Sequence, residues 1–300
     1  MRSMDDRQWK IIQQMLAAET SGSELKPMAS QRTLFGIPSS VDIALQKIVE
    51  EDEMKHQDIE TLRTWIAECA PGRLVFFGGA GVSTESGIPD FRSPDGLYAQ
   101  KYGDVRPEEM ISRSYFNRHP EKFFAFYFDR MVAREAQPNR AHRKLAELEK
   151  DGILSAVITQ NIDGLHQAAG SENVYELHGS ILRNYCMHCG APYNLDGITE
   201  LHEQADDGVP RCPECGGIVK PDVVLYEESL DGRVLDASIR AIASADVMVI
   251  AGTSLAVYPA AGLIDYFQGN HLAIINLSPT PRDRTADLCI AAKVGEVFDF

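Results

Sequence analysis

Residues 73–98 read RLVFFGGAGVSTESGIPDFRSPDGLY, and they organise the rest of this 300-residue chain. The stretch begins with a short apolar run, residues 74–77, between a Pro-Gly pair and several glycines. Such a run is typical of a strand buried on both faces of a parallel sheet. Gly79 and Gly81 let the backbone approach a ligand closely, and Ser83 can begin a helix whose N–H groups face that ligand. The stretch therefore predicts a phosphate-binding turn after a central strand.

The glycines alone leave the ligand open. They match neither G-x-G-x-x-G nor a Walker A sequence, and an ordinary glycine turn after a strand explains them equally well. The continuation, residues 87–93 (GIPDFRS), places a phenylalanine and an arginine beside a proline turn. That composition suits a flap over a ligand better than a core segment, and it favours nucleotide binding.

Composition excludes several classes of protein. Hydrophobic residues make up 44% of the chain and charged residues 24%, as in ordinary globular proteins. No apolar run approaches the roughly 20 residues of a membrane span, and the N-terminal residues lack a signal-peptide core. We therefore expect a cytoplasmic protein that binds no membrane. The net charge of −15 argues against direct nucleic-acid binding and tolerates cationic partners such as lysine-rich tails.

Residues 1–55 stand apart as an N-terminal extension. Amphipathic patterns predict helices at residues 9–16 and 41–55, with Ser40 as N-cap of the second. A third helix, residues 58–69, leads into the strand at Leu74. None of the extension carries recognisable chemistry, so a role in packing or oligomerisation is the simplest interpretation.

Polar side chains follow most of the further apolar runs, which predict strands at residues 153–158, 174–177, 245–251 and 272–275. Ligands of doubly wound sheets bind at the carboxyl ends of such strands. A histidine in that place can be a core residue or a general base, and the polar neighbours favour the base for His178, whereas His142 is interpreted as structural. The candidate ligand-facing residues are Gln160, Asn161, Asp163, His178, Gly252, Thr253, Ser254 and Asn276.

Two C-x-x-C pairs predict a metal site. Cys186 and Cys189 are followed after 22 residues by Cys212 and Cys215, a spacing close to that of zinc ribbons. Four thiolates complete a tetrahedral zinc site, which is therefore expected to be structural. The two isolated cysteines, Cys69 and Cys289, are expected to be buried small hydrophobes. The aromatic-rich residues 106–134 predict a helical insert, and its aromatic side chains are expected to form a wall of an apolar channel.

Together these motifs resemble the sirtuin family, in its bacterial form. GAGVSTESGIPDFRS, TQNIDGLH, HGS, the paired C-x-x-C, KPDVVLYEE, GTSLAVYPAAG and an asparagine after the last long strand follow in the family's order, over residues 59–297. The resemblance implies an α/β fold with a Rossmann-type parallel sheet domain and a smaller domain made of a zinc ribbon and a helical insert. It divides residues 56–300, the catalytic domain, into a Rossmann-type part (56–95, 138–182, 221–300), the insert (96–137) and the zinc ribbon (183–220).

The resemblance also implies roles for individual residues. The catalytic residues are His178, as the base, and Asn161. The NAD-binding residues are Gly79, Ala80, Gly81, Thr84, Phe91, Arg92, Gln160, Asn161, Ile162, Asp163, Gly252, Thr253, Ser254, Asn276 and Val294. The peptide-binding residues are Val223, Val224, Tyr226, Glu227 and Val257, and the zinc ligands are Cys186, Cys189, Cys212 and Cys215.

The implied activity is NAD-dependent removal of acetyl or other apolar acyl groups from protein lysines, giving nicotinamide and O-acyl-ADP-ribose. Acyl-lysine proteins or peptides are the implied partners, and zinc takes no chemical part. A sirtuin-like NAD glycohydrolase or mono-ADP-ribosyltransferase would use the same cofactor site, and the sequence separates these alternatives poorly. A non-enzymatic zinc-ribbon module would have no need of Asn161, Asp163 and His178.

The chain departs from the family's pattern at two places. Gly78 replaces the usual threonine and is expected to loosen the strand end, and Tyr226-Glu227-Glu228 replaces FGE, which favours basic peptides. Residues 93–104, the stretch matched to the acyl pocket, contain no arginine and only Lys101 as a cation. A buried carboxylate without a bidentate partner is costly, so acetyl or longer aliphatic groups are expected to be preferred over succinyl.

Overall fold

The computed structural model describes residues 40–94, 96–99 and 105–300, with side chains from residue 46. Its internal contacts divide the chain into two units, Met1–Glu60 and Thr61–Phe300. The helix predicted at residues 9–16 and Lys101 lie outside the described residues. The separate helices predicted at 41–55 and 58–69 are wrong: one helix, α2 (Ser40–Glu68), covers both, because no Gly or Pro interrupts the pattern. None of the described helices is both long and apolar enough to cross a membrane.

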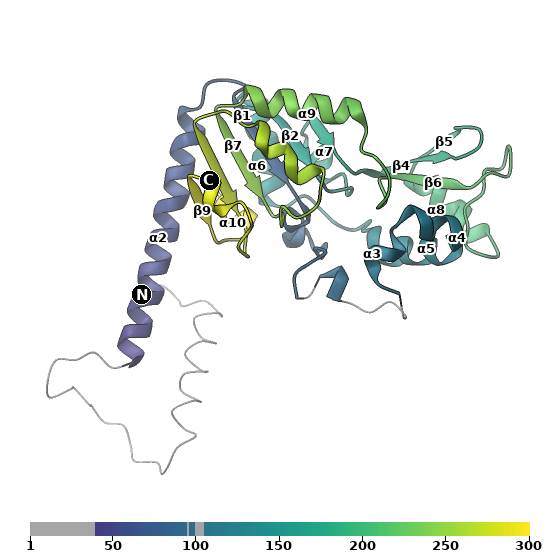
Figure 1. The fold of residues 1–300 in the computed structure, drawn as a ribbon, viewed down its shortest axis with the longest axis horizontal. Helices are drawn as coiled ribbons and strands as arrows, with labels where there is room; N and C mark the ends of the chain where they lie inside the picture. The colour runs from purple at the N-terminus through teal and green to yellow at the C-terminus, as the bar shows by residue number, and fades with distance from the viewer. Residues whose placement is uncertain (1–39, 95, 100–104) are drawn as a thin grey trace, which may run out of the picture. The chain divides into compact units, whose positions relative to one another are not determined.

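The predicted parallel sheet is confirmed (Figure 1). Its order within the described residues is β3 (Val174–Glu176), β2 (Leu154–Thr159), β1 (Leu74–Gly78), β7 (Val247–Ala251), β8 (His271–Ile275) and β9 (Leu288–Ile290). This is the Rossmann order 3-2-1-4-5-6, in which a crevice opens where the strand order reverses, here between β1 and β7. Cys289 lies on the edge strand β9 and is exposed, and Cys69 is only half-buried, so the expectation of burial for these two cysteines is wrong.

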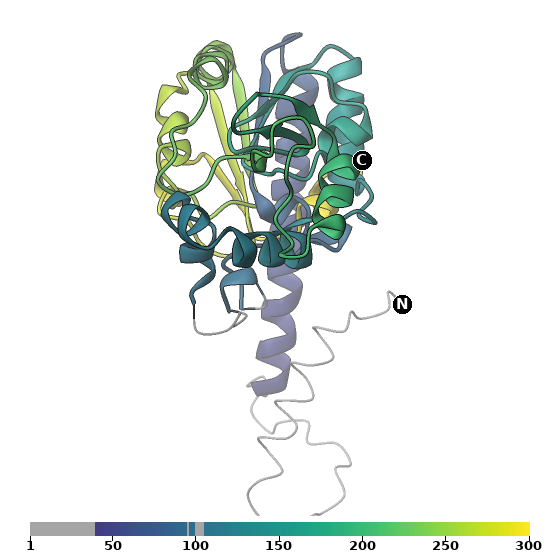
Figure 2. The ribbon, with the colours of Figure 1, turned by 90° about the vertical axis from the view of Figure 1, so that its right-hand side faces the viewer.

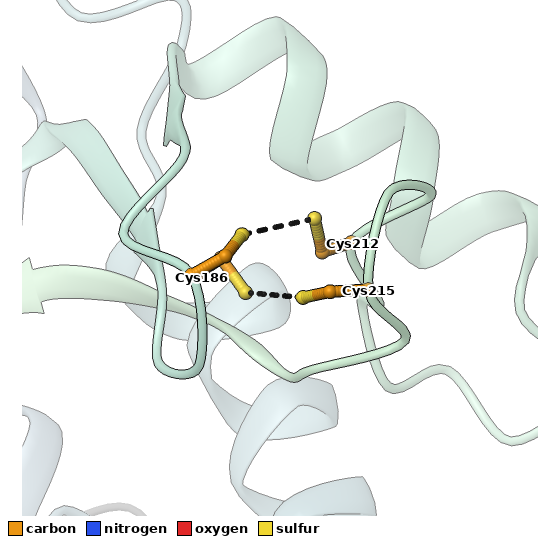
Figure 3. Close-up of side chains that lie close together, drawn as sticks. Cys186, Cys212 and Cys215 are labelled. Atoms are coloured by element: carbon orange, nitrogen blue, oxygen red, sulfur yellow. Dashed lines mark hydrogen bonds between the residues drawn. The ribbon is translucent and has the colours of Figure 1, made fainter.

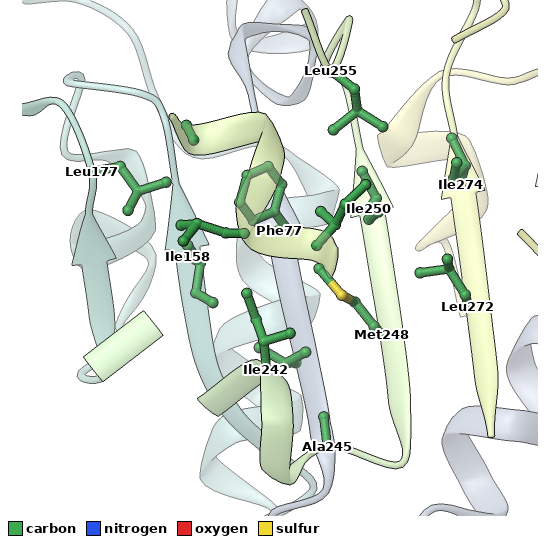
Figure 4. Packing of buried hydrophobic residues seen from close by; sticks show 14 residues of the cluster. Phe77, Ile158, Leu177, Ile242, Ala245, Met248, Ile250, Leu255, Leu272 and Ile274 are labelled. Atoms are coloured by element: carbon green, nitrogen blue, oxygen red, sulfur yellow. The ribbon is translucent and has the colours of Figure 1, made fainter. Parts of the chain in front are cut away.

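Alternation along the strands directs neighbouring side chains to opposite faces. Phe77 and Ile250 pack with Ile242 of α9 (Gly232–Ser244) and with η5 (Ala260–Tyr266), as Figure 4 shows. Phe76 points the other way, with ring centroids 5.9 Å from Phe298 and 6.1 Å from His166. That face carries α6 (Arg140–Lys150), α7 (Leu165–Ala169) and α10 (Val294–Val297), so helices cover both faces (Figure 2). The sheet is thus buried on both sides, as its apolar runs predict.

The segment after β1 differs from the prediction. Instead of an α-helix it forms two 3₁₀ turns, η1 (Ala80–Val82) and η2 (Thr84–Ser86), which end at Gly87 with φ 84°. Two short turns keep more backbone near the sheet edge than a helix leading away would. Gly78 does not loosen the strand, because it pairs in register with Thr159 and Ala251, and an added Cβ would meet Phe76 at 2.8 Å.

The smaller part combines the helical insert with a second sheet (Figure 1). The insert contains α3 (Pro107–Met110), α4 (Arg113–Arg118), α5 (Pro120–Phe126) and η4 (Tyr127–Met131), after η3 (Leu97–Ala99). The sheet is antiparallel in the order β5 (Pro192–Tyr193), β4 (Gly179–Cys186) and β6 (Val219–Val223), with α8 (Leu195–Gln204) beside it. Buried aromatic side chains of α4 and α5 share one core with Cys186 and Val219. A last turn, η6 (Asp283–Thr285), precedes β9.

Candidate active site

A cavity of about 450 Å³ opens at the carboxyl ends of the central strands and extends toward the smaller part. Every residue predicted for catalysis, NAD or peptide binding lines it, although they come from segments far apart in the sequence. From the glycine-rich turn and flap these are Gly79, Ala80, Gly81, Thr84, Phe91 and Arg92. From the ends of β2 and β3 they are Gln160, Asn161, Ile162, Asp163 and His178, and from β6 and its loop Val223, Val224, Tyr226 and Glu227. The remainder are Gly252, Thr253, Ser254, Val257, Asn276 and Val294.

Two glycine-containing loops meet at the switch point between β1 and β7. Gly81 donates its N–H to the carbonyl of Gly252 at 2.8 Å, and a Cβ on Gly81 would lie 2.7 Å from the Gly252 Cα. Gly252 itself has φ 60°, a conformation that favours glycine. Gln160 then donates from Nε2 to Thr253 Oγ1 at 3.0 Å, which ties the end of β2 to this floor. Because the two loops contact each other through their backbones, the space next to this contact is available to phosphate groups rather than to side chains of the loops.

Ser83 is the centre of a buried polar network that the sequence did not identify. Its hydroxyl, 1% exposed, donates to Asp163 Oδ2 at 2.7 Å and accepts from Asn161 Nδ2 at 3.0 Å. His142 Nε2 lies 3.5 Å from the same oxygen, while His142 Nδ1 and Asn139 form the capping box of α6. Burial lowers the pKa of His142 to about 4, so the ring is neutral at pH 7. The network presents an amide and a carboxylate to the cavity in fixed positions, and His142 has the structural role predicted for it.

One hydrogen bond sets the orientation of the His178 ring. Its Nδ1 lies 3.0 Å from the carbonyl of Gln160, so the ring donates Nδ1–H there and Nε2 carries the lone pair. Burial lowers the pKa of His178, and the hydrogen bond to Gln160 opposes that shift in part. The ring is therefore neutral near pH 7 and able to accept a proton from a group in the cavity.

The departure Tyr226-Glu227-Glu228 has a structural explanation. Glu227 adopts φ 76°, and its carboxylate accepts from both the N–H and the hydroxyl of Ser114, at 2.9 and 2.6 Å. Glu228 pairs with Arg113 at 2.6 Å and with Lys220 at 3.4 Å. Both carboxylates thus have partners within the protein. Ser114 is neutral, so Glu227, the added carboxylate, keeps its negative charge at the surface, and the bias toward basic peptides stays a prediction.

The flap and the insert supply further residues to the cavity. Arg92 contacts the Tyr226 hydroxyl at 3.5 Å and lies over the ring of Tyr98, whose hydroxyl is 3.0 Å from that of Tyr226. Arg130, from the π-helical turn η4, also lines the cavity and pairs with Asp129 at 2.7 Å. Arg130 lies outside residues 93–104, the stretch on which the predicted acyl preference rests. Nothing in its sequence context distinguishes it from the surrounding insert.

The four predicted zinc ligands come together. All four sulfurs lie within 4.8 Å of one another, and the Cys186–Cys215 and Cys189–Cys212 separations are 3.4 and 3.7 Å. Zinc–sulfur bonds of roughly 2.3 Å in a tetrahedron require sulfurs roughly 3.8 Å apart, so the cluster fits zinc. Figure 3 shows Cys186 facing Cys212 and Cys215 across the site. Tyr193 donates its hydroxyl to Cys212 at 3.1 Å and lowers the pKa of that thiol, which favours the thiolate a metal needs.

This geometry defines a Rossmann-type α/β protein with a nucleotide cavity at the switch point and a structural zinc ribbon. The Sir2 family model matches residues 79–259. NAD-dependent protein deacetylases of Clostridium acetobutylicum and Clostridium perfringens are 53% and 56% identical, over 80% and 75% of this chain and 96% and 91% of theirs. A solved Sir2 protein bound to an acetylated peptide superposes with a TM-score of 0.70 at 36% identity, over 80% of this chain and 95% of that one. The chain belongs to the Sir2 family.

Proposed function

We propose that the chain removes acetyl groups from lysine side chains of proteins, with NAD as co-substrate. One observation carries the proposal: the glycine loops, the network centred on Ser83 and the oriented His178 all line a single cavity. A phosphate-binding turn without a positioned base would suit many nucleotide-binding proteins. A phosphate-binding turn together with a positioned base suits a reaction on the bound nucleotide. Relatives named NAD-dependent protein deacetylase and a solved Sir2 complex with a peptide and NAD⁺ agree with it.

The residues divide the work between the two substrates. The loops at Gly79–Gly81 and Gly252–Ser254 hold the pyrophosphate against their closely packed backbones, with Asn276 and Val294 at the adenosine half. Asn161 and Asp163, held by Ser83, hold the nicotinamide end. NAD would supply an electrophilic ribose carbon as nicotinamide leaves, and the acyl oxygen would bond to that carbon. A ribose hydroxyl would then take over the acyl group, so that, with one water, lysine leaves as the free amine and O-acyl-ADP-ribose forms. His178 removes the proton from a ribose hydroxyl, and the strand from Val223 with its loop binds the peptide backbone beside Val257.

Product analysis tests the proposal. An acetyl-lysine peptide incubated with NAD should yield nicotinamide, free-lysine peptide and O-acetyl-ADP-ribose in equal amounts by mass spectrometry. A glycohydrolase would release ADP-ribose and leave the peptide acetylated. An ADP-ribosyltransferase would add the mass of ADP-ribose to the peptide. Either of these two results would refute deacetylation.

We also propose that residues 56–300 form the catalytic domain and residues 1–55 an extension, a division close to the observed one at Glu60. The four clustered cysteines support a cytoplasmic location, because thiols stay reduced and able to bind zinc there. The net charge of −15 supports peptide partners with cationic lysine-rich segments over nucleic acid.

A further inference from the structure

Glu85 links two walls of the cavity without lining it. It belongs to η2, directly after the turn that carries Gly79 to Thr84, and its Oε2 accepts from the N–H of Gly295 at 2.6 Å. The two residues are 210 positions apart. A Cβ on Gly295 would lie 2.7 to 2.9 Å from the Glu85 carboxylate atoms, so the carboxylate packs directly on the glycine backbone.

The contact holds the segment that forms the far end of the cavity. Gly295 lies in the first turn of α10, whose N-cap, Lys293, provides no side-chain cap. The first N–H groups of a helix have no partner within it, and Glu85 supplies one from the other side of the site. Ala292, Lys293 and Val294 line the cavity just before this point. Fixing Gly295 therefore fixes their backbone relative to the glycine-rich turn.

We propose that Glu85 is a positioning residue for the adenosine half of NAD: it sets the separation between the phosphate turn and the wall at Val294. The inference rests on the proposed function for the identity of the ligand. A carboxylate so near a phosphate site would by itself weaken binding of an anionic ligand, so its charge does not explain its presence. The hydrogen bond that its Oε2 accepts from the N–H of Gly295 explains why a carboxylate lies here.

Substitutions separate the acceptor from the charge. Glu85→Ala removes both, whereas Glu85→Gln keeps an acceptor and removes the charge. We expect Glu85→Ala to raise the KM for NAD and the Kd of ADP-ribose roughly fivefold, the effect of one lost hydrogen bond, with kcat and the KM for acetyl peptide little changed. Glu85→Gln should stay near wild type. Glu203→Ala, on the exposed face of α8 and outside the cavity, is the matched control.

A double-substitution cycle gives an independent test. The Gly295 backbone lies outside the left-handed region, so Gly295→Ala costs little in the backbone but displaces the carboxylate. We expect it to weaken ADP-ribose binding in the wild type and to add little in the Glu85→Ala background. Three results would each overturn the inference. ADP-ribose binding could be unchanged in Glu85→Ala, or its Kd could change equally in the Ala and Gln variants at position 85. The substitutions at Glu85 and Gly295 could also have independent, additive effects on that Kd. If wild type binds ADP-ribose with the expected ranking of variants but does not deacetylate, only the proposed function fails.

Discussion

Replacing His178 by alanine tests the base directly. The substitution removes one hydrogen bond, to the carbonyl of Gln160 at 3.0 Å, worth about 1 kcal/mol, so the protein should still fold. It also removes the group that accepts the proton, and a positioned base contributes ~10² to 10⁴ in rate, roughly 3–5 kcal/mol of barrier. We therefore expect kcat for deacetylation to fall at least roughly a hundredfold, with ADP-ribose binding largely intact.

The pH dependence gives a second signature of the same residue. Burial lowers the pKa of His178 from its ordinary value of about 6.5. Only the neutral ring can accept a proton, so kcat/KM should fall as the pH falls through the lowered pKa. The acidic limb of the profile should thus have its midpoint below about 6.5 in the wild type. It should vanish in the residual activity of His178→Ala.

The assay compares nicotinamide exchange with deacetylation of one acetyl peptide. Cleavage of the nicotinamide bond precedes proton removal in the proposed scheme, so exchange should survive while deacetylation is lost. His119→Ala, at a half-exposed histidine outside the cavity, serves as control. Near-normal deacetylation by His178→Ala at saturating NAD and peptide would show that His178 is not the base, and equal loss of exchange would show that it acts earlier.

Three further predictions concern the metal, the acyl group and acid stability. Cys186→Ser or Cys212→Ser should lower zinc content and Tm together, because the free energy of metal binding at such sites contributes directly to folding. Cys289→Ser, the control, should change neither. Stoichiometric zinc in both ligand variants would contradict the ligand set. Acetyl- and myristoyl-lysine peptides should have a higher kcat/KM than the succinyl-lysine peptide. The two arginines that line the cavity already have contacts within the protein, Arg130 with Asp129 and Arg92 with Tyr226, and are therefore less available to a succinyl carboxylate. A preference for succinyl would refute this. Burial lowers the pKa of His142 to about 4 and of His166 to about 3, so the folded protein resists protonation that the unfolded chain accepts below about 6.5. These two histidines should cost about 2–3 kcal/mol in urea unfolding between pH 7 and 5.5, to which the lowered pKa of His178 adds. The loss should be smaller by about 1 kcal/mol in His166→Leu, and an unaltered pH dependence in that variant would contradict the assignment.

Much of the fold follows from the sequence because its signals are local. A strand buried on both faces appears as a short apolar run, and the residue after it lies at the ligand edge, which suffices to place Asn161 and His178. The spacing of Cys186 and Cys212 likewise predicts the zinc site. Ser83, Glu85 and Arg130 escaped prediction because their roles depend on which distant segments pack beside them. No local pattern reveals that Glu85 meets a backbone N–H near the C-terminus.

The shared core of the smaller part has a consequence for inhibition. The same cluster that contains Cys186 and Cys212 extends through the insert to Val223 and Met131, which face the cavity. This wall of the cavity is therefore continuous with the zinc site. A chelator that extracts the metal should disable the enzyme slowly and without competing with either NAD or peptide. Excess NAD should offer no protection against it.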